Sequence, residues 1–167
     1  IYDLNEIVKI RELCDKKKLG LHLDGARLWN ALEVTKESPK QYGELFDTIS
    51  LCLSKGLGCP VGSVLVGSKK NINKALRIRK VFGGGMRQAG YLAAAGSYAL
   101  KHHRSDLNTD HKKAKEIAST LKNCAYVNEI NPVETNIIIF SLKSQYDEVS
   151  FVEKLKNKNI LIMSLGK

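Results

Sequence analysis

Two short segments carry side chains suited to covalent chemistry. In the first, residues 22–27 read His-Leu-Asp-Gly-Ala-Arg, so Asp24 ends an apolar stretch and Arg27 follows three residues later. In the second, residues 54–58 read Ser-Lys-Gly-Leu-Gly, and Lys55 directly follows an apolar run. A lysine amine that is kept uncharged is a nucleophile able to form a Schiff base. The two segments would therefore supply a carboxylate, a guanidinium group and a reactive amine.

Each segment also has a purely structural interpretation. Asp is favoured at helix starts, so Asp24 would cap a helix that begins at Ala26. Lys55, which lies between small residues, would be typical of an exposed turn. The combination favours chemistry, because pyridoxal phosphate (PLP) needs a lysine for its aldehyde, a carboxylate at its pyridine nitrogen and a donor at its ring oxygen. Lys55, Asp24 and Arg27 would supply these groups, and the glycines beside Lys55 would let backbone approach a flat ligand.

Hydrophobic spacing predicts the elements that position these groups. Asp24 ends a predicted strand over 21–24, and Lys55 follows a predicted strand over 47–53. Ligands of open α/β sheets bind at the carboxyl ends of strands, where both residues would lie. The other predicted elements are helices over 3–19 (capped by Asp3 and stopped by Gly20), 26–34, 70–82, 86–101, 107–121 and 147–156, strands over 62–67, 126–130, 135–142 and 160–163, and a loop over 35–46 with Pro39 and Gly43 as breakers.

Three blocks of the sequence resemble the low-specificity L-threonine aldolases, which are fold type I, aspartate-aminotransferase-like, PLP-dependent enzymes. The blocks are LHLDGARLW at 21–29, LSKGLGCPVG at 53–62 and GGGMRQAG at 83–90. Three blocks in order are far more specific than a lone motif. The resemblance implies an α/β fold, with part of a mostly parallel-sheet, PLP-binding large domain over 1–102 and a small, incomplete C-terminal α+β lobe over 103–167.

The resemblance also implies roles for individual residues. Lys55 matches the catalytic lysine that forms the internal aldimine with PLP, and Asp24 matches the carboxylate that pairs with the pyridine nitrogen. Arg27 matches the arginine near the ring hydroxyl oxygen and the substrate carboxylate. Arg87 is expected near the cofactor phosphate or a subunit interface. No metal is expected.

Two further residues have more than one interpretation. His22 is expected on the same strand face as Asp24, where it could touch the pocket, although a satisfied core histidine is the preferred interpretation. Asn136 lies in a stretch that recurs in the family, and its structural interpretation is a turn before a strand.

The activity implied is cleavage of L-threonine or L-allo-threonine to glycine and acetaldehyde, by a retro-aldol reaction through an external aldimine. The protein would be a cytoplasmic carbon–carbon lyase of threonine catabolism and glycine biosynthesis, and a homo-oligomer, either a tetramer or a dimer. Another fold type I reaction, β-elimination or transamination, stays open as an alternative. Substrate choice in this family depends largely on segments that this sequence does not contain.

The sequence is interpreted as a fragment, because members of the family are much longer. The turn that cradles the cofactor phosphate, the histidine that stacks on the ring and the arginine that binds the substrate carboxylate should all lie outside it. Residues 1–167 alone are therefore expected to be inactive.

Composition excludes several other classes of protein. The 167 residues are 43% hydrophobic and 26% charged, which is typical of a globular domain, and no apolar run approaches about 18 residues. No signal peptide points to export, and the four cysteines form no CxxC pair, which favours reduced thiols.

The net charge of +10 leaves a nucleic-acid-binding module as an alternative, but the basic clusters are scattered and carry no known motif. A small amino-acid substrate is the expected partner, with no nucleic acid and no membrane.

Overall fold

The computed structural model describes residues 1–166, which divide into two compact units. Unit 1 spans Ile1–Asp110, and unit 2 begins at His111, inside helix α6 (Leu107–Leu121). Both units combine helices and strands, and each is described by itself. Within the described part of the chain, no helix is both long enough and apolar enough to cross a membrane.

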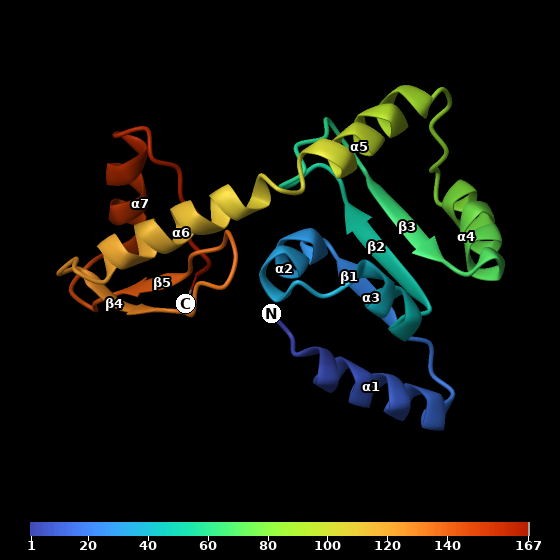
Figure 1. The fold of residues 1–167 in the computed structure, drawn as a ribbon. Helices are drawn as coiled ribbons and strands as arrows, with labels where there is room; N and C mark the ends of the chain where they lie inside the picture. The colour runs from blue at the N-terminus through green and yellow to red at the C-terminus, as the bar shows by residue number, and fades with distance from the viewer. Residues whose placement is uncertain (167) are drawn as a thin grey trace. The chain divides into compact units, whose positions relative to one another are not determined.

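Unit 1 is built on a three-stranded sheet with the order β1-β2-β3 (Figure 1). β1 (His22–Gly25) pairs in parallel with β2 (Thr48–Cys52), and β2 pairs antiparallel with β3 (Ser63–Gly67). The parallel pair is joined by a crossover that contains two helices, as parallel strands require. The carboxyl ends of β1 and β2 therefore lie at the same edge of the sheet.

The register divides the side chains of the sheet between two faces. Leu23 lies opposite Ile49, and Ile49 lies opposite Val66, so these three residues share one face. Asp24 lies opposite Ser50 and belongs to the other face, together with His22. The first face carries the buried core residues of β2, whereas Asp24 and His22 are exposed.

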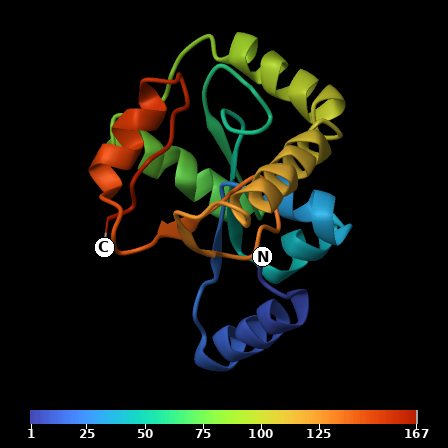
Figure 2. The ribbon, with the colours of Figure 1, turned by 90° about the vertical axis from the view of Figure 1, so that its left-hand side faces the viewer.

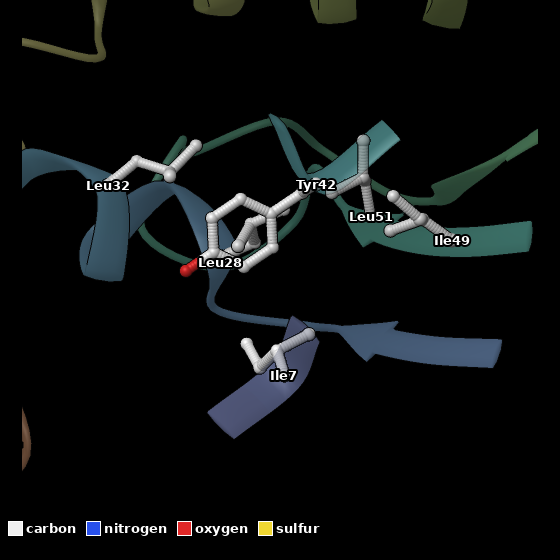
Figure 3. Close-up of a cluster of buried hydrophobic side chains, with 6 residues drawn as sticks. All are labelled: Ile7, Leu28, Leu32, Tyr42, Ile49 and Leu51. Atoms are coloured by element: carbon white, nitrogen blue, oxygen red, sulfur yellow. The ribbon is translucent and has the colours of Figure 1, made fainter. Parts of the chain in front are cut away.

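Three helices cover the apolar face. They are α1 (Leu4–Lys17), α2 (Leu28–Thr35) and α3 (Pro39–Leu45). Figure 3 shows the side chains that these helices and β2 bury together, namely Ile7, Leu28, Leu32, Tyr42, Ile49 and Leu51. In Figure 2, α1 lies at the bottom of the view and its connection rises into β1. Burial of large side chains such as Leu32 and Tyr42, each 3% exposed, stabilises the unit by about 1.5–3 kcal/mol apiece.

A second, smaller cluster lies beyond β2. Leu53, Leu57 and Cys59 come from the loop that follows the strand, and Ala99 comes from α5 (Gly90–His102). This cluster fixes the loop that carries Lys55 against α5. The remaining helix of unit 1, α4 (Lys69–Val81), follows β3 and is capped by the side chain of Ser68.

The prediction of a loop over 35–46 is wrong, because α3 occupies most of it. Ser38 accepts a hydrogen bond from Lys40 N–H, and Gln41 completes a capping box at the backbone N–H of Ser38 (2.7 Å). Pro39 occupies the first helical turn, where its missing N–H costs nothing. The predicted stop of α1 at Gly20 is also wrong, since the helix ends at Lys17 and its C-cap is Lys18, whose φ is +56°.

Unit 2 combines the rest of α6 with a two-stranded antiparallel sheet and a final helix. The elements are β4 (Val127–Ile130), β5 (Phe140–Leu142) and α7 (Glu148–Lys156). Phe151 of α7 contacts the rings of Tyr126 and Phe140, with centroid distances of 5.1 and 6.3 Å. The predicted strand over 135–142 is only three residues long, and the strand predicted over 160–163 is not formed. A strand requires a paired neighbour, and within residues 1–166 β4 and β5 pair only with each other.

Asp47 links α1, the residue before β1 and the first turn of α4 by hydrogen bonds. Its carboxylate accepts hydrogen bonds from Leu21 N–H (2.7 Å) and from the Arg11 guanidinium group (3.0 Å). Its backbone carbonyl accepts from the Asn71 side chain (3.2 Å). The hydrogen bond from Leu21 N–H, followed by that from Arg11, lowers the pKa of the Asp47 carboxyl.

This lowered pKa predicts a loss of stability in acid. The folded carboxyl has a lower pKa than the unfolded one, so it stabilises the fold above about pH 4, and this contribution disappears as pH falls through the folded pKa. Because Asp47 is 48% exposed, solvent screening limits the effect to about 0.5–1 kcal/mol. Chemical unfolding of wild type and Asp47→Asn should differ at pH 6, and the difference should shrink steadily as the pH is lowered below about 4. The variant Glu44→Gln, at an exposed helix position, should show no such decrease; a difference between wild type and Asp47→Asn that stays the same as the pH falls would contradict the prediction.

Candidate active site

Asp24 lies one residue before the end of β1. Its side chain is on the face of the sheet opposite to the apolar core, which is called the open face below. Its Oδ1 atom accepts a hydrogen bond from Ala26 N–H (3.1 Å). α2 does not begin at Ala26 but at Leu28, with Arg27 at the N-cap position and no side-chain cap. The interpretation of Asp24 as a helix cap is therefore wrong, and its second carboxylate oxygen is free to bind a ligand group.

Gly25, the neighbour of Asp24, has no room for a side chain. A Cβ at this position would lie 2.7 Å from the backbone oxygen of Ser50 and 3.1–3.2 Å from the side chains of Leu51 and Ile49. The close approach of β1 to β2 beside Asp24 therefore requires glycine.

Gly25→Ala is expected to destabilise the protein by about 1–3 kcal/mol, because backbone and core must move apart. Gly43→Ala is a matched control with the opposite expected sign. A Cβ at Gly43 meets nothing within 4 Å, and alanine in a helix is favoured over glycine by about 0.5–1 kcal/mol. Urea unfolding of both variants checks the prediction, and equal stability of the two would refute it.

Lys55 lies in a tight loop three residues after the end of β2. The loop is closed by hydrogen bonds from Gly58 N–H to the Lys55 carbonyl (2.8 Å) and from Cys59 N–H to the Leu53 carbonyl (3.1 Å). Gly58 has a φ of +70°, a conformation that favours glycine. The Lys55 side chain is exposed, and no hydrogen bond or ion pair engages its amine within residues 1–166.

The register between β1 and β2 brings the two segments to one edge of the sheet. Gly25 lies opposite Leu51, so Asp24 and the loop carrying Lys55 both lie at the carboxyl end of this parallel pair. Arg27 follows in the turn that leaves the same edge and enters α2, and its side chain is exposed. Three of the four residues predicted for the site thus come from neighbouring segments of the fold.

The other predicted residues lie elsewhere. Arg87 is exposed in the segment between α4 and α5, and no contact links it to the other three residues within the described chain. His22 shares the face of Asp24 as predicted, but it is exposed and not a core residue, with its Nδ1 2.8 Å from the Thr48 hydroxyl. Asn136 lies in the bend that precedes β5, and its Oδ1 is buried without a hydrogen-bond partner among residues 1–166.

The junction between α5 and α6 contacts the Lys55 loop. His103 Nδ1 lies 2.8 Å from the Leu57 carbonyl oxygen. A Cβ on Gly56 would come within 2.7 Å of the Leu107 side chain, which is 1% exposed, so loop and junction are in tight contact. No local pattern in the sequence predicts this contact, because Leu57 and His103 are 46 residues apart.

The same junction also holds α2. The Arg104 guanidinium group stacks over the Trp29 ring at 4.7 Å and lies 3.8 Å from the Glu33 carboxylate. The side-chain amide of Asn108 donates to the same carboxylate (2.9 Å). The junction therefore contacts both the helix that follows Arg27 and the loop that carries Lys55.

The donor set at this edge fits PLP in its chemistry. An exposed carboxylate with a free oxygen suits a protonated ring nitrogen, an unengaged amine suits an aldehyde, and a guanidinium group suits an oxygen anion. Gly56, which follows Lys55 directly, adds no side chain beside it. Among residues 1–166, no group of three or more His, Cys, Asp or Glu side chains is arranged to hold a metal ion.

Comparison with known proteins gives a consistent result. A sequence model of the beta-eliminating lyase family matches residues 1–145. The low-specificity L-threonine aldolase of Candida albicans is 43% identical over 165 residues, and that of Saccharomyces cerevisiae is 40% identical over 165 residues. These alignments cover 98% of this chain but only 44% and 42% of the relatives, so the chain spans less than half their length.

Solved structures confirm the predicted α/β fold. A crystal structure from Listeria monocytogenes, provisionally called an L-allo-threonine aldolase, superposes with a TM-score of 0.82 at 24% identity. The superposition covers 98% of this chain and 46% of that one. A cystathionine gamma-lyase from Lactobacillus plantarum superposes with a TM-score of 0.59 at 16% identity and covers 88% of this chain. At such identities the likeness concerns the fold alone.

Proposed function

Because the chain belongs to the beta-eliminating lyase family, we propose that its full-length protein is a PLP-dependent lyase that cleaves L-threonine or L-allo-threonine to glycine and acetaldehyde. The observation that carries the proposal is the β1–β2 register, with Asp24 and the Lys55 loop at one edge of the sheet. The names of the curated relatives support the choice of threonine as substrate.

Each residue at this edge has a distinct role in the proposal. When bound, PLP supplies an aldehyde that condenses with primary amines and a ring that accepts electrons. The amine of Lys55 anchors the cofactor and gives way to the amine of the substrate. The Asp24 carboxylate accepts a hydrogen bond from the ring nitrogen and holds the proton there. Arg27 provides positive charge for the ring oxygen or the substrate carboxylate.

The atoms and electrons of the proposed cleavage balance without another reactant. A base removes the proton of the β-hydroxyl group, the bond between Cα and Cβ breaks, and the Cβ fragment leaves as acetaldehyde. A proton added at Cα then gives glycine. We propose no side chain of residues 1–166 as this base. A water molecule could accept the proton from the β-hydroxyl group.

β-Elimination is a second candidate, because the matching family model carries that description. The two reactions have different products: aldol cleavage releases acetaldehyde and glycine, whereas elimination releases ammonia. Incubation of the full-length protein with L-threonine, followed by assay of both acetaldehyde and ammonia, distinguishes them.

The proposal extends to assembly and cellular role. We expect a homo-oligomer, a dimer or a tetramer, with Arg87 near the cofactor phosphate or a subunit interface. Large apolar side chains near Arg87 in the sequence support an interface there, since Phe82 and Tyr91 are each 85% exposed. The activity would serve threonine catabolism and glycine biosynthesis in the cytoplasm.

Borohydride reduction of the protein isolated from its source tests the proposed function. Reduction converts a PLP–lysine linkage into a stable secondary amine, which peptide mass spectrometry locates. We expect the modification on Lys55. A folded protein that binds PLP with no modification at Lys55 would contradict the proposal.

A further inference from the structure

Within residues 1–166, the side chain of His103 in the α5–α6 junction makes a hydrogen bond to the backbone of the Lys55 loop. Its Nδ1 lies 2.8 Å from the Leu57 carbonyl oxygen, which is two residues beyond Lys55. A carbonyl oxygen only accepts hydrogen bonds, so Nδ1 carries the proton and donates. His103 is partly buried, and the Tyr98 ring packs against it edge-on at 5.5 Å, which restricts its orientation.

The Leu57 carbonyl has a particular need for this donor. Leu57 is 2% exposed, so water has little access to the residue. The neighbouring hydrogen bonds of the loop involve the carbonyls of Lys55 and Leu53, not that of Leu57. Buried carbonyl groups are nearly always hydrogen-bonded, and here the partner is the His103 ring.

The Lys55 side chain, by contrast, makes no hydrogen bond or ion pair of its own within residues 1–166. Its amine has no partner within residues 1–166, and its neighbours Ser54 and Gly56 are exposed. The direction in which the amine points therefore depends on the loop backbone. That backbone is fixed by the turn hydrogen bonds, by the burial of Leu57 and by His103.

We propose that His103 is a positioning residue for Lys55: by donating to the Leu57 carbonyl, it holds the loop so that the amine faces the edge where Asp24 lies. This inference rests on the proposed function for the role of the amine, but its structural part can be tested separately. The loop-forming segment and the junction are 46 residues apart in sequence, so the contact is a property of the fold.

Three variants of the full-length protein test the inference. His103→Leu removes the donor with little change in bulk, and His103→Asn keeps an N–H donor close to the position of Nδ1. His102→Leu is the matched control, because His102 is exposed at the end of α5, packs against the Tyr98 ring and makes no hydrogen bond to the loop within residues 1–166. Hydrogen–deuterium exchange of the peptide containing residues 54–59 is measured for each, together with the rate at which Lys55 is modified by PLP and borohydride.

We expect His103→Leu to raise the exchange rate of the Gly58 and Cys59 amides at least fivefold and to slow the modification of Lys55 by a similar factor. His103→Asn and His102→Leu should match wild type in both measurements. Wild-type behaviour of His103→Leu in both would overturn the inference. If His103→Leu does not fold, His103→Gln takes its place, because its donor is one bond farther out; equal behaviour of Gln and Asn variants would overturn the inference. Failure of the proposed function would instead appear as absence of Lys55 modification in wild type, while the exchange result would still report on His103.

Discussion

Replacement of Lys55 by alanine in the full-length protein is expected to abolish covalent binding of PLP and to lower kcat/KM for threonine cleavage by about 10⁴-fold or more. Losses of this size follow removal of a residue that forms a covalent bond during catalysis. The structure supports a local effect, because the Lys55 side chain is exposed and makes no hydrogen bond or ion pair within residues 1–166. Folding should therefore be unaffected.

Lys55→Arg separates the role of the amine from the role of the charge. Arginine keeps the positive charge, but its guanidinium group does not lose its proton in proteins and so cannot form the linkage to PLP. We expect this variant to be as inactive as Lys55→Ala. Lys40→Ala, at an exposed position on α3, is the control and should retain wild-type kcat/KM. Acetaldehyde release measures activity; a Lys55→Arg variant with more than a small fraction of wild-type activity would contradict the assignment.

Replacement of Asp24 by asparagine is expected to lower kcat by about 10²–10³-fold, the usual effect of removing one preorganised electrostatic group. Asparagine has the same shape and can still accept the hydrogen bond from Ala26 N–H, so the turn into α2 should be preserved. What is lost is the negative charge that would hold a proton on the ring nitrogen. PLP should still become attached to Lys55, which distinguishes this variant from Lys55→Ala.

Steady-state kinetics and borohydride labelling, applied together, check this prediction. Labelling of Lys55 should be the same in Asp24→Asn and wild type, while kcat falls and KM changes little. Glu12→Gln, which removes an exposed carboxylate on α1, is the control for loss of one negative charge and should leave kcat unchanged. If Asp24→Asn has wild-type kcat, the carboxylate does not act on the ring, and another acid must be sought.

Most helices and the central strands could be predicted from the sequence, because their signals are local. Both bounds of α6, Leu107–Leu121, agree with the prediction, and Asp3 caps α1 as expected. The candidate residues Asp24, Arg27 and Lys55 could also be proposed from the sequence, because they lie in short blocks of distinctive composition. Periodicity, caps and motifs depend on residues only a few positions apart, so the sequence alone contains the information needed to predict them.

Other features depended on the tertiary structure. Pro39 and Gly43 suggested a loop, but burial of Tyr42 against the core and the capping box at Ser38 favour α3. Residues 160–163 have the composition of a strand, yet a strand forms only where a paired neighbour is available. In both places, contacts beyond the immediate sequence outweighed local preference.

The sequence by itself determined which residues can do chemistry and which elements carry them. Only the tertiary structure decided that Asp24 lies on the open face of the sheet, that Asp24 does not cap α2, and that His103 reaches the Lys55 loop. The reason is physical: residue types and short-range periodicity are properties of the chain, whereas a hydrogen bond between residues 57 and 103 exists only after β2, α5 and α6 have packed.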